Sequence, residues 1–392
     1  MRVLFITNRV PFPLKDGGNV VIYNTIEALK SKHSISLLSL NTSKHFTKLT
    51  SLPPLFKKLN HFSAMPINTN LNVGGALLAL LKNQSYNIKR FYSKNFDTTI
   101  VDFIKTNNPK VVQLEGLFLA PYIDIIRKHS SAKIILRAHN VEHVIWEELT
   151  KEAHGLKKFY LNLLAQQLKK EEVIAFNKVD VVACLSKLDK VIIEDLCKTK
   201  CIAINPLFKL PNAISYVKIK EITQFGHIGA MDWLPNKEAV ETLISSIWPF
   251  VFKKHPKCTL HLAGKSLNKN QYKSLGVINY GEVDSAESFM SKLNVLVVPL
   301  SSGSGIRIKI LEAMALGKIV IASPHALKGL NVSNNVEVLI STTPEEFIKN
   351  CNFCIENTEK AQTIGKNGQK WVQNEFNREK IVEDFNQLYL SE

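Results

Sequence analysis

The sequence predicts an α/β protein built from two doubly wound, Rossmann-like domains. Short β-branched runs alternate with helical patterns along the chain. Most of these runs are continuously apolar, which is typical of parallel strands buried on both faces. Their alternation with helices favours doubly wound sheets. The chain has 392 residues, of which 45% are hydrophobic and 21% charged, so it is long enough for two domains with sizeable cores.

The predicted strands are the short apolar runs, taken in chain order. They cover residues 3–7, 35–40, 110–114, 133–137, 179–184, 201–204, 223–228, 259–263, 277–280, 295–299, 319–322 and 336–340. The predicted helices cover residues 20–31, 117–128, 186–196, 236–254, 285–293 and 308–316. So many strands exceed an ordinary open sheet, and we therefore divide the chain into two domains.

The domain boundary falls where periodicity is lost. The segment after residue 205 is poorly periodic and contains Pro206 and Pro211, which predicts a linker. We expect an N-terminal domain at 1–205, a linker at 206–222, a C-terminal domain at 223–375 and a C-terminal helix at 376–392. The two domains are expected to face each other across a cleft, with ligands at the carboxyl ends of the strands.

One segment, residues 44–94, interrupts the strand–helix alternation. It contains two basic, apolar patches, at 46–59 and 74–92. A basic amphipathic segment of this kind can lie on an anionic membrane surface. The alternative is a helical subdomain that packs against the rest of the first domain and is solvated by its lysines. The sequence leaves both interpretations open.

The charge is strongly positive. Lys and Arg outnumber Asp and Glu by 50 to 34, a net charge of +16. The excess indicates an anionic partner such as nucleotide phosphates or an anionic membrane, or else a solubilising surface. Nucleic acid is not an expected partner, because the basic residues are scattered and not interleaved with stacking aromatics.

Cysteine spacing and the N-terminus bear on the compartment. Only Cys351 and Cys354 show a C-x-x-C spacing, and no second pair follows, so we expect ordinary thiols in a reducing compartment. The first apolar run is too short for a signal peptide. No stretch is long enough to span a membrane. The expected location is the cytoplasm, with at most peripheral membrane contact at the inner face of the membrane.

Residues 294–317 carry the main functional signal. An apolar strand is followed by the loop Gly303-Ser304-Gly305 and then by a helix with Arg307 and Lys309 near its start. Glycines let backbone N–H groups approach an anion closely, and a helix N-terminus favours negative charge. Two cations at that end of a helix are most easily explained by a multiply charged anion beside them. The segment therefore predicts a diphosphate site.

This segment resembles the donor site of retaining, two-domain GT-B glycosyltransferases of family 4. That family has two glutamates eight positions apart, followed by Ala, a small residue and Gly. Here Glu312 matches the second glutamate, and the resemblance implies that it hydrogen-bonds the donor ribose. Ser304 occupies the position of the first glutamate, which in the family meets the sugar. The pattern Gly-Ser-Gly-Ile-Arg-x-Lys-x-Leu-Glu-Ala resembles a subgroup with a different phosphate clamp.

The resemblance extends to further positions of the C-terminal domain. It implies that Gly229, after the first strand, and Gly264, in a strand-end turn, let the backbone pass the donor. Val283 lies in the loop expected to hold the base. The position of the family's usual phosphate-binding Arg falls on Ala230. We therefore expect Arg307 and Lys309 to replace that arginine.

The N-terminal domain matches the family at two strand ends. Asp16, Gly17 and Gly18 resemble its glycine-rich loop near the donor phosphate and acceptor, and Asp16 is a candidate to orient an acceptor hydroxyl. His139 matches a histidine near the transferred sugar, whose two nitrogens can hydrogen-bond the sugar and polarise a reacting oxygen. The remaining candidates, expected to line the acceptor side, are Glu115, Glu142 and His143.

The resemblance implies transfer of a sugar from a nucleotide-diphosphate sugar to an acceptor hydroxyl, with retention. No loop carries the D-x-D pair of a metal-held diphosphate, so no metal or other cofactor is expected. The acceptor is expected to be a saccharide, which could be lipid-linked, in bacterial polysaccharide or glycoconjugate synthesis. Two alternatives stay open: a GT-B nucleotide-sugar epimerase, and a catalytically inactive binding relative.

Overall fold

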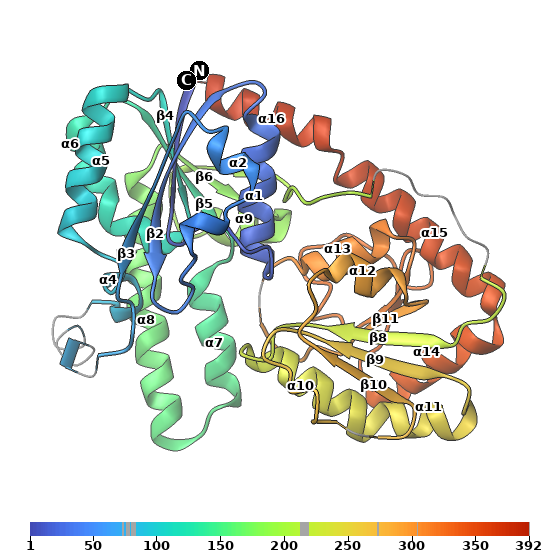
Figure 1. Cartoon of the computed structure of the whole chain (residues 1–392). Coiled ribbons are helices and arrows are strands. Elements are labelled where there is room, and N and C mark those ends of the chain that lie inside the picture. The colour runs from blue at the N-terminus through green and yellow to red at the C-terminus, as the bar shows by residue number, and fades with distance from the viewer. Residues whose placement is uncertain are drawn as a thin grey trace. The chain divides into compact units, whose positions relative to one another are not determined.

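A computed structural model describes residues 1–72, 74, 75, 79, 84–211, 219–272, 274–303 and 305–391 (Figure 1). The chain forms two compact units. Unit 1 contains residues 1–207 and 378–392, and unit 2 contains residues 208–377. Three predicted features lie outside the described residues, in whole or in part: Ser304, residues 212–218 of the linker, and much of the second basic patch.

Unit 1 contains a seven-stranded sheet in the order β3-β2-β1-β4-β5-β6-β7, and its strands are parallel. The strands are β1 (Arg2–Thr7), β2 (Ser34–Thr42), β3 (His61–Ile67), β4 (Val111–Glu115), β5 (Lys133–Ala138), β6 (Val181–Cys184) and β7 (Lys200–Ala203). The central strands are buried along almost their whole length. This agrees with the continuous apolar runs in the sequence.

Helices connect these strands. They are α1 (Gly17–Leu29), η1 (Leu49–Ser51), α2 (Pro54–Lys57), α4 (Tyr86–Lys89), α5 (Lys94–Asn107), η2 (Leu117–Tyr122), α6 (Ile123–His129), α7 (Glu142–Glu152), α8 (Gly155–Lys178), α9 (Lys187–Glu194) and α16 (Arg378–Leu390). The last of these, α16, buries Ile381, Phe385 and Leu388. Its backbone carbonyl at Leu388 accepts a hydrogen bond from Lys133 Nζ of β5 at 2.9 Å, so the C-terminal helix packs on the sheet of unit 1.

The strand β3 is missing from the sequence prediction. It lies within the segment 44–94 that we expected to be either membrane-bound or helical, and it pairs with β2 at the edge of the sheet. Most of its residues are only half-buried, so it lacks the continuous apolar run by which the other strands are recognised. An edge strand has one neighbour rather than two, which relaxes the demand for apolar side chains.

Unit 2 contains a six-stranded parallel sheet in the order β10-β9-β8-β11-β12-β13. The strands are β8 (Gln224–Ile228), β9 (Thr259–Ala263), β10 (Val277–Gly281), β11 (Val295–Val298), β12 (Ile319–Ala322) and β13 (Leu339–Ile340). The helices are α10 (Leu234–Thr242), α11 (Trp248–Lys254), α12 (Ala286–Ser291), α13 (Ile308–Ala315), α14 (Pro344–Glu356) and α15 (Thr358–Glu375). The prediction of doubly wound, Rossmann-like sheets is thereby confirmed.

The predicted helix at 236–254 is interrupted. Between α10 and α11 the chain forms a π-helical turn, η3 (Leu243–Ile247). Pro249 follows directly inside the first turn of α11. Proline has no N–H and its ring crowds the preceding turn, so the regular α-helical hydrogen-bond ladder does not continue through this point. The break therefore has a local cause in the sequence.

The six cysteines form no disulfide bonds. All six cysteines are free thiols, and both Cys351 and Cys354 are buried in the core of unit 2. Within the part of the chain that the structure describes, no helix is long and apolar enough to cross a bilayer.

Candidate functional site

The predicted site residues fall into two groups, one in each unit. In unit 1 they follow β1, β4 and β5, which are neighbours in the sheet. In register, Thr7 pairs with Glu115, and Glu115 pairs with Arg137. Parallel strands present their carboxyl ends at one edge of the sheet. Asp16, Glu115 and His139 therefore belong to the same edge, which we call the unit 1 site.

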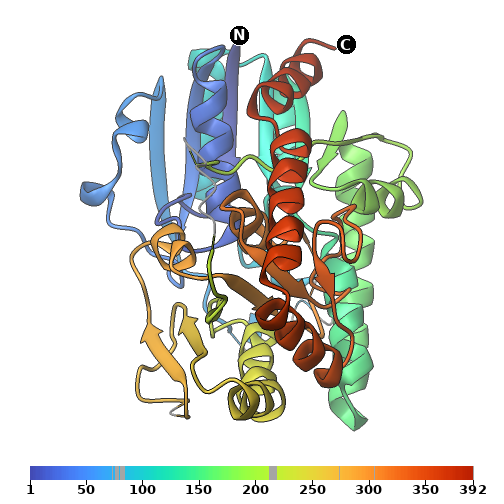
Figure 2. The ribbon, with the colours of Figure 1, turned by 90° about the vertical axis from the view of Figure 1, so that its right-hand side faces the viewer.

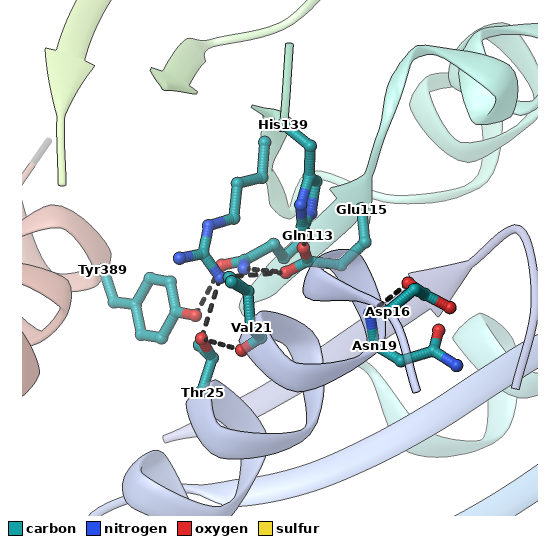
Figure 3. Close-up of polar contacts among 9 residues, drawn as sticks. Asp16, Asn19, Val21, Thr25, Gln113, Glu115, His139 and Tyr389 are labelled. Carbon is teal, nitrogen blue, oxygen red and sulfur yellow. Dashed lines mark hydrogen bonds and ion pairs between the residues drawn. The ribbon is translucent and has the colours of Figure 1, made fainter. Parts of the chain in front are cut away.

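At the unit 1 site, the side chains of Glu115 and His139 form a close pair (Figure 3). Nε2 of His139 lies 2.6 Å from Oε2 of Glu115. Glu115 is fully buried, whereas 15% of the His139 side chain is exposed. Because a carboxylate only accepts, Nε2 of His139 carries the proton that is donated to Glu115. The other ring nitrogen, Nδ1, is the one available to a ligand.

The charge of Glu115 is maintained by its neighbours. Burial raises the pKa of this carboxyl, but the Arg137 guanidinium and the hydrogen bonds from His139 and Gln113 outweigh it, so the pKa lies below its usual value. Nη1 of Arg137 lies 3.7 Å from Oε1 of Glu115 and donates to Oγ1 of Thr25 at 2.9 Å. Glu115 is therefore an ionised carboxylate in the protein interior, and the Arg137 guanidinium stabilises its charge.

The C-terminal helix completes this network. The hydroxyl of Tyr389, on α16, donates to Oε1 of Gln113 at 2.5 Å, and Nε2 of Gln113 donates to Oε1 of Glu115 at 2.5 Å. Figure 3 shows Tyr389 pointing toward Gln113. The guanidinium of Arg137 also lies 4.9 Å from the ring centroid of Phe385 on the same helix. A residue near the end of the chain thus supports His139 through two intermediate side chains.

Asp16 is engaged at the start of α1. Its Oδ1 accepts from the backbone N–H of Asn19 at 3.0 Å and from Nη2 of Arg9 at 2.6 Å. A Cβ atom on Gly18 would lie 2.9 Å from Nη2 of Arg9, so the glycine makes room for this ion pair. Gly17 is the first residue of the helix. The structure therefore places Asp16 as an N-cap beside a cation.

Glu142 and His143 begin α7, and both are tied to Glu172 of α8. The carboxylate of Glu172 accepts from the backbone N–H of Glu142 at 2.9 Å and from Nδ1 of His143 at 2.5 Å. Burial and, secondarily, the charge of Glu172 raise the pKa of Glu142 to about 7. Glu115 and His143 are almost fully buried. Both were expected to line the acceptor side. In the structure their side chains bond to other protein groups in the interior.

In unit 2, two predicted glycines meet. A Cβ on Gly264 would lie 1.7 Å from the carbonyl oxygen of Gly229, and a Cβ on Gly229 would lie 2.5 Å from the side chain of Asn236. The turns after β8 and β9 thus pass each other in backbone contact, which only glycine permits at Gly264. This brings Gly229 and Gly264 together at the carboxyl end of neighbouring strands.

Gly303, before α13, packs on an indole ring. Gly303 and Gly305 have φ angles of +95° and +83°, which favour glycine. A Cβ on Gly303 would lie 2.4 Å from the ring of Trp233. The guanidinium of Arg307 stacks 4.8 Å from the centroid of the same ring, and the carbonyl oxygen of Gly303 accepts from the ring of His325. Trp233, the residue before α10, therefore contacts both Gly303 and the Arg307 guanidinium.

Lys309 occupies a different position from Arg307. Its Nζ donates to the carbonyl oxygen of Ile228 at 2.9 Å and to Oδ1 of Asn236 at 2.8 Å. Nε2 of His227 lies 3.4 Å away. Burial and the nearby Arg307 lower the pKa of Lys309 to about 7. Lys309 thus ties α13 to the end of β8.

The last two candidates in unit 2 lie near α12. Glu312 is half-buried on α13, and burial, with a smaller contribution from Glu287, raises its pKa to about 7. Val283 lies in the loop between β10 and α12 and is half-buried. We call Gly229, Gly264, Gly303, Gly305, Arg307 and Glu312 the unit 2 site.

Several residues of these sites were not among the sequence candidates. Arg137 has a recognisable signal, since it is a charged residue within an otherwise apolar strand. Trp233 and Arg9 lie inside loops that the sequence singles out. Tyr389 was not a candidate. Gln113 lies beside Glu115 in the segment expected on the acceptor side, but nothing in the sequence pairs it with Tyr389, which is 276 positions away.

Unit 2 is similar in sequence to a known protein family. The family described as "Glycosyl transferases group 1" matches residues 223–357. A curated relative, "Uncharacterized glycosyltransferase MJ1069" of Methanocaldococcus jannaschii, is 26% identical over 132 residues, or 33% of this chain. That match spans 32% of the relative, about a third of its length.

Solved structures resemble the whole chain. Anabaena Alr3699/HepE, in complex with UDP and glucose, is 14% identical with a TM-score of 0.69, and the likeness covers 99% of both chains. Sucrose-phosphate synthase from Thermosynechococcus elongatus is 15% identical with a TM-score of 0.71, covering 99% of this chain and 98% of that one. At this identity the likeness establishes the fold, and the chain has the two-domain GT-B fold.

Proposed function

We propose that this protein is a glycosyltransferase that moves a sugar from a nucleotide-diphosphate sugar to an acceptor hydroxyl. The observation that carries the proposal is the unit 2 site. The glycine loop, Arg307 and Glu312 lie in the segment that matches the group 1 glycosyltransferase family. A structural neighbour with the same fold binds UDP-glucose, which is consistent with such a donor here.

In this proposal the residues of the unit 2 site have distinct tasks. Arg307, held over Trp233, faces the diphosphate, and the N–H groups of the glycine loop add neutral donors. Glu312 accepts from the ribose hydroxyls. Lys309, whose pKa is lowered to about 7, adds partial positive charge while it anchors α13 to the end of β8. Gly229, Gly264 and Val283 line the path of the donor, and Ser304 is assigned to the sugar end.

The unit 1 site supplies the groups around the reacting atoms. Nδ1 of His139 contacts the transferred sugar, with its orientation set by Glu115. Asp16, Gly17 and Gly18 orient the acceptor. Glu142, whose pKa burial raises to about 7, is assigned to the acceptor side. Glu115 and His143 act from behind this surface.

The proposed transfer proceeds with retention. The acceptor oxygen forms a bond to the anomeric carbon on the face from which the diphosphate departs. The bond from that carbon to the diphosphate breaks, and the acceptor proton passes to the leaving diphosphate oxygen. Positive charge and backbone donors on the diphosphate make it a better leaving group. In this mechanism the protein needs no metal or other cofactor.

The finer assignment follows from the motif pattern. We assign the chain to family 4, in the subgroup with Gly-Ser-Gly-Ile-Arg-x-Lys-x-Leu-Glu-Ala, acting in bacterial polysaccharide or glycoconjugate synthesis. The acceptor is a saccharide, for which a lipid-linked form suits the basic charge of the protein. The enzyme is placed in the cytoplasm at the inner face of the membrane.

A donor panel tests the proposal. Nucleotide sugars that differ in base and sugar are screened by thermal shift, since a ligand at about 100 times its dissociation constant stabilises by about 2.7 kcal/mol. Arg307→Glu should abolish the shift, whereas Arg378→Glu, at an exposed position of α16, should preserve it. Full donor affinity in Arg307→Glu would refute the role of Arg307.

Product analysis then separates the alternatives. The donor is incubated with and without candidate acceptor saccharides. Acceptor-dependent release of nucleoside diphosphate, with a retained anomeric configuration, is the expected result. Conversion of the donor sugar without any acceptor would identify an epimerase. Donor binding with no turnover on any acceptor would favour a binding relative.

A further inference from the structure

The start of α8, next to the turn from α7, exposes large apolar side chains. Leu156, Phe159 and Tyr160 are 90%, 74% and 48% exposed. At spacings of three and four residues they share one face of α8. Lysines 157 and 158 lie among them and are exposed as well. We call these five residues the hairpin tip.

The hairpin tip lies beyond the sheet of unit 1. The helix α8 has 24 residues, which corresponds to about 36 Å, whereas β4 and β5 have only 5 and 6 residues, or about 17–20 Å. The first residue of α8 that is buried is Ala165. Figures 1 and 2 show α7 and α8 extending away from the sheet as a hairpin.

The hairpin tip extends from the edge that carries the unit 1 site. Helix α7 begins at Glu142, three residues after His139, at the carboxyl end of β5. It leads away from that edge, and α8 returns along the sheet. The hairpin tip and the unit 1 site are therefore on the same side of unit 1.

The composition of the hairpin tip indicates its partner. Exposed aromatic and aliphatic side chains on a helix, with lysines beside them, match an interfacial segment on an anionic bilayer, where rings enter the headgroup region and lysines meet phosphates. An isolated apolar patch would suit a protein partner equally well. A second copy of this chain is disfavoured, because a two-fold contact at the tip would bring the lysines of both copies together.

We propose that the hairpin tip docks the protein on a membrane that contains anionic phospholipids. Leu156, Phe159 and Tyr160 enter the interface, and Lys157 and Lys158 contact lipid phosphates. This deepens the proposed function, on which its purpose rests, because docking there would present the unit 1 site toward a lipid-linked acceptor. The sequence suggested membrane contact at residues 44–94, whereas this proposal assigns it to the hairpin tip.

The test is binding of the full chain to lipid vesicles. We expect binding to vesicles of phosphatidylcholine with phosphatidylglycerol, and little to phosphatidylcholine alone. The Lys157→Glu, Lys158→Glu variant should bind about 30-fold more weakly. The Leu156→Ser, Phe159→Ser variant should lose at least about tenfold. The matched control is Lys105→Glu, Lys128→Glu, which makes the same charge change at exposed positions elsewhere in unit 1.

Three results would overturn the proposal. The full chain could fail to bind anionic vesicles, or both tip variants could bind as well as the control variant. Light scattering could instead show a dimer that the tip substitutions dissociate. Thermal shift with nucleotide sugars, run on the same variants, should be unchanged. Donor binding without vesicle binding would refute only the docking surface, and vesicle binding without donor binding would refute only the glycosyltransferase.

Discussion

Nε2 of His139 lies 2.6 Å from Oε2 of Glu115, and this contact decides which nitrogen of the histidine can meet a ligand. Glu115 is buried and ionised, so it accepts the Nε2 proton and leaves Nδ1 as the ring nitrogen without this contact. A histidine at a strand end can adopt either tautomer when it is free. Here the buried carboxylate of Glu115 selects the tautomer that carries its proton on Nε2.

Replacing Glu115 with Gln should slow sugar transfer about 10- to 100-fold. The amide can donate or accept, so His139 would no longer be held in one tautomer. Donor affinity, which depends on the unit 2 site, should remain within about twofold. Steady-state kinetics with a donor titration separate the two quantities, and ¹⁵N NMR of the imidazole reports the tautomer directly.

This substitution also leaves Arg137 buried with a weaker partner. We expect a lower melting temperature, since breaking a buried ion pair costs about 3–5 kcal/mol, so kinetics are measured well below the unfolding midpoint. Glu194→Gln, at an exposed position of α9, is the control and should change neither rate nor tautomer. An unchanged rate and a single tautomer in Glu115→Gln would contradict the role given to Glu115.

Tyr389→Phe should destabilise the protein by about 1–3 kcal/mol, because it removes a buried donor and leaves Oε1 of Gln113 unpaired. Denaturant unfolding of parent and variant measures the difference. Tyr92→Phe is a matched control, because the Tyr92 hydroxyl bonds to Asp97 at an exposed position. Equal stability of parent and Tyr389→Phe would show that α16 does not support the Glu115 network in this way.

Gly264→Ala should be among the most damaging small substitutions in unit 2. The new Cβ would lie 1.7 Å from the Gly229 carbonyl oxygen, so one of the two turns must move, at a cost of about 3 kcal/mol or more. Donor binding should fall as well. Gly155→Ala provides the comparison: it has a φ of +57° but open space around it, so it should cost only about 1–2 kcal/mol.

The raised pKa of Glu312 predicts a pH dependence of stability. Between the usual pKa near 4.5 and the folded value of about 7, the folded state binds more protons than the unfolded state. The stability of the parent should therefore fall as the pH rises through this window. Glu312→Gln should lack this loss and be more stable than the parent by about 1–3 kcal/mol above pH 7.

The difference between the two proteins should disappear near pH 4. Unfolding free energies measured for parent and Glu312→Gln across this range test the prediction. A constant difference between parent and variant would indicate that Glu312 titrates normally. Glu359→Gln, in the first turn of α15, is the control substitution.

Local sequence patterns determined most of the architecture. The strands β11 and β12 and the helix α13 follow from their apolar runs and period, and Gly303 and Gly305 follow from the turn between them. These features depend on neighbours in the chain, which a sequence displays directly. The half-buried edge strand β3 has no such run and was therefore missed, and the π-helical turn before Pro249 divides a helix that the pattern predicts as one.

Tertiary structure alone decided which candidates act together. Glu115 reaches His139 because β4 and β5 pair in a particular register, and Tyr389 joins them from a helix 276 positions from Gln113. The sequence by itself established two Rossmann-like sheets, a glycine loop before a helix, and the residue types at the strand ends. Burial and long-range contacts, which depend on the folded backbone and not on sequence spacing, selected the tautomer of His139, bonded Lys309 to the end of β8, and stacked Arg307 on Trp233.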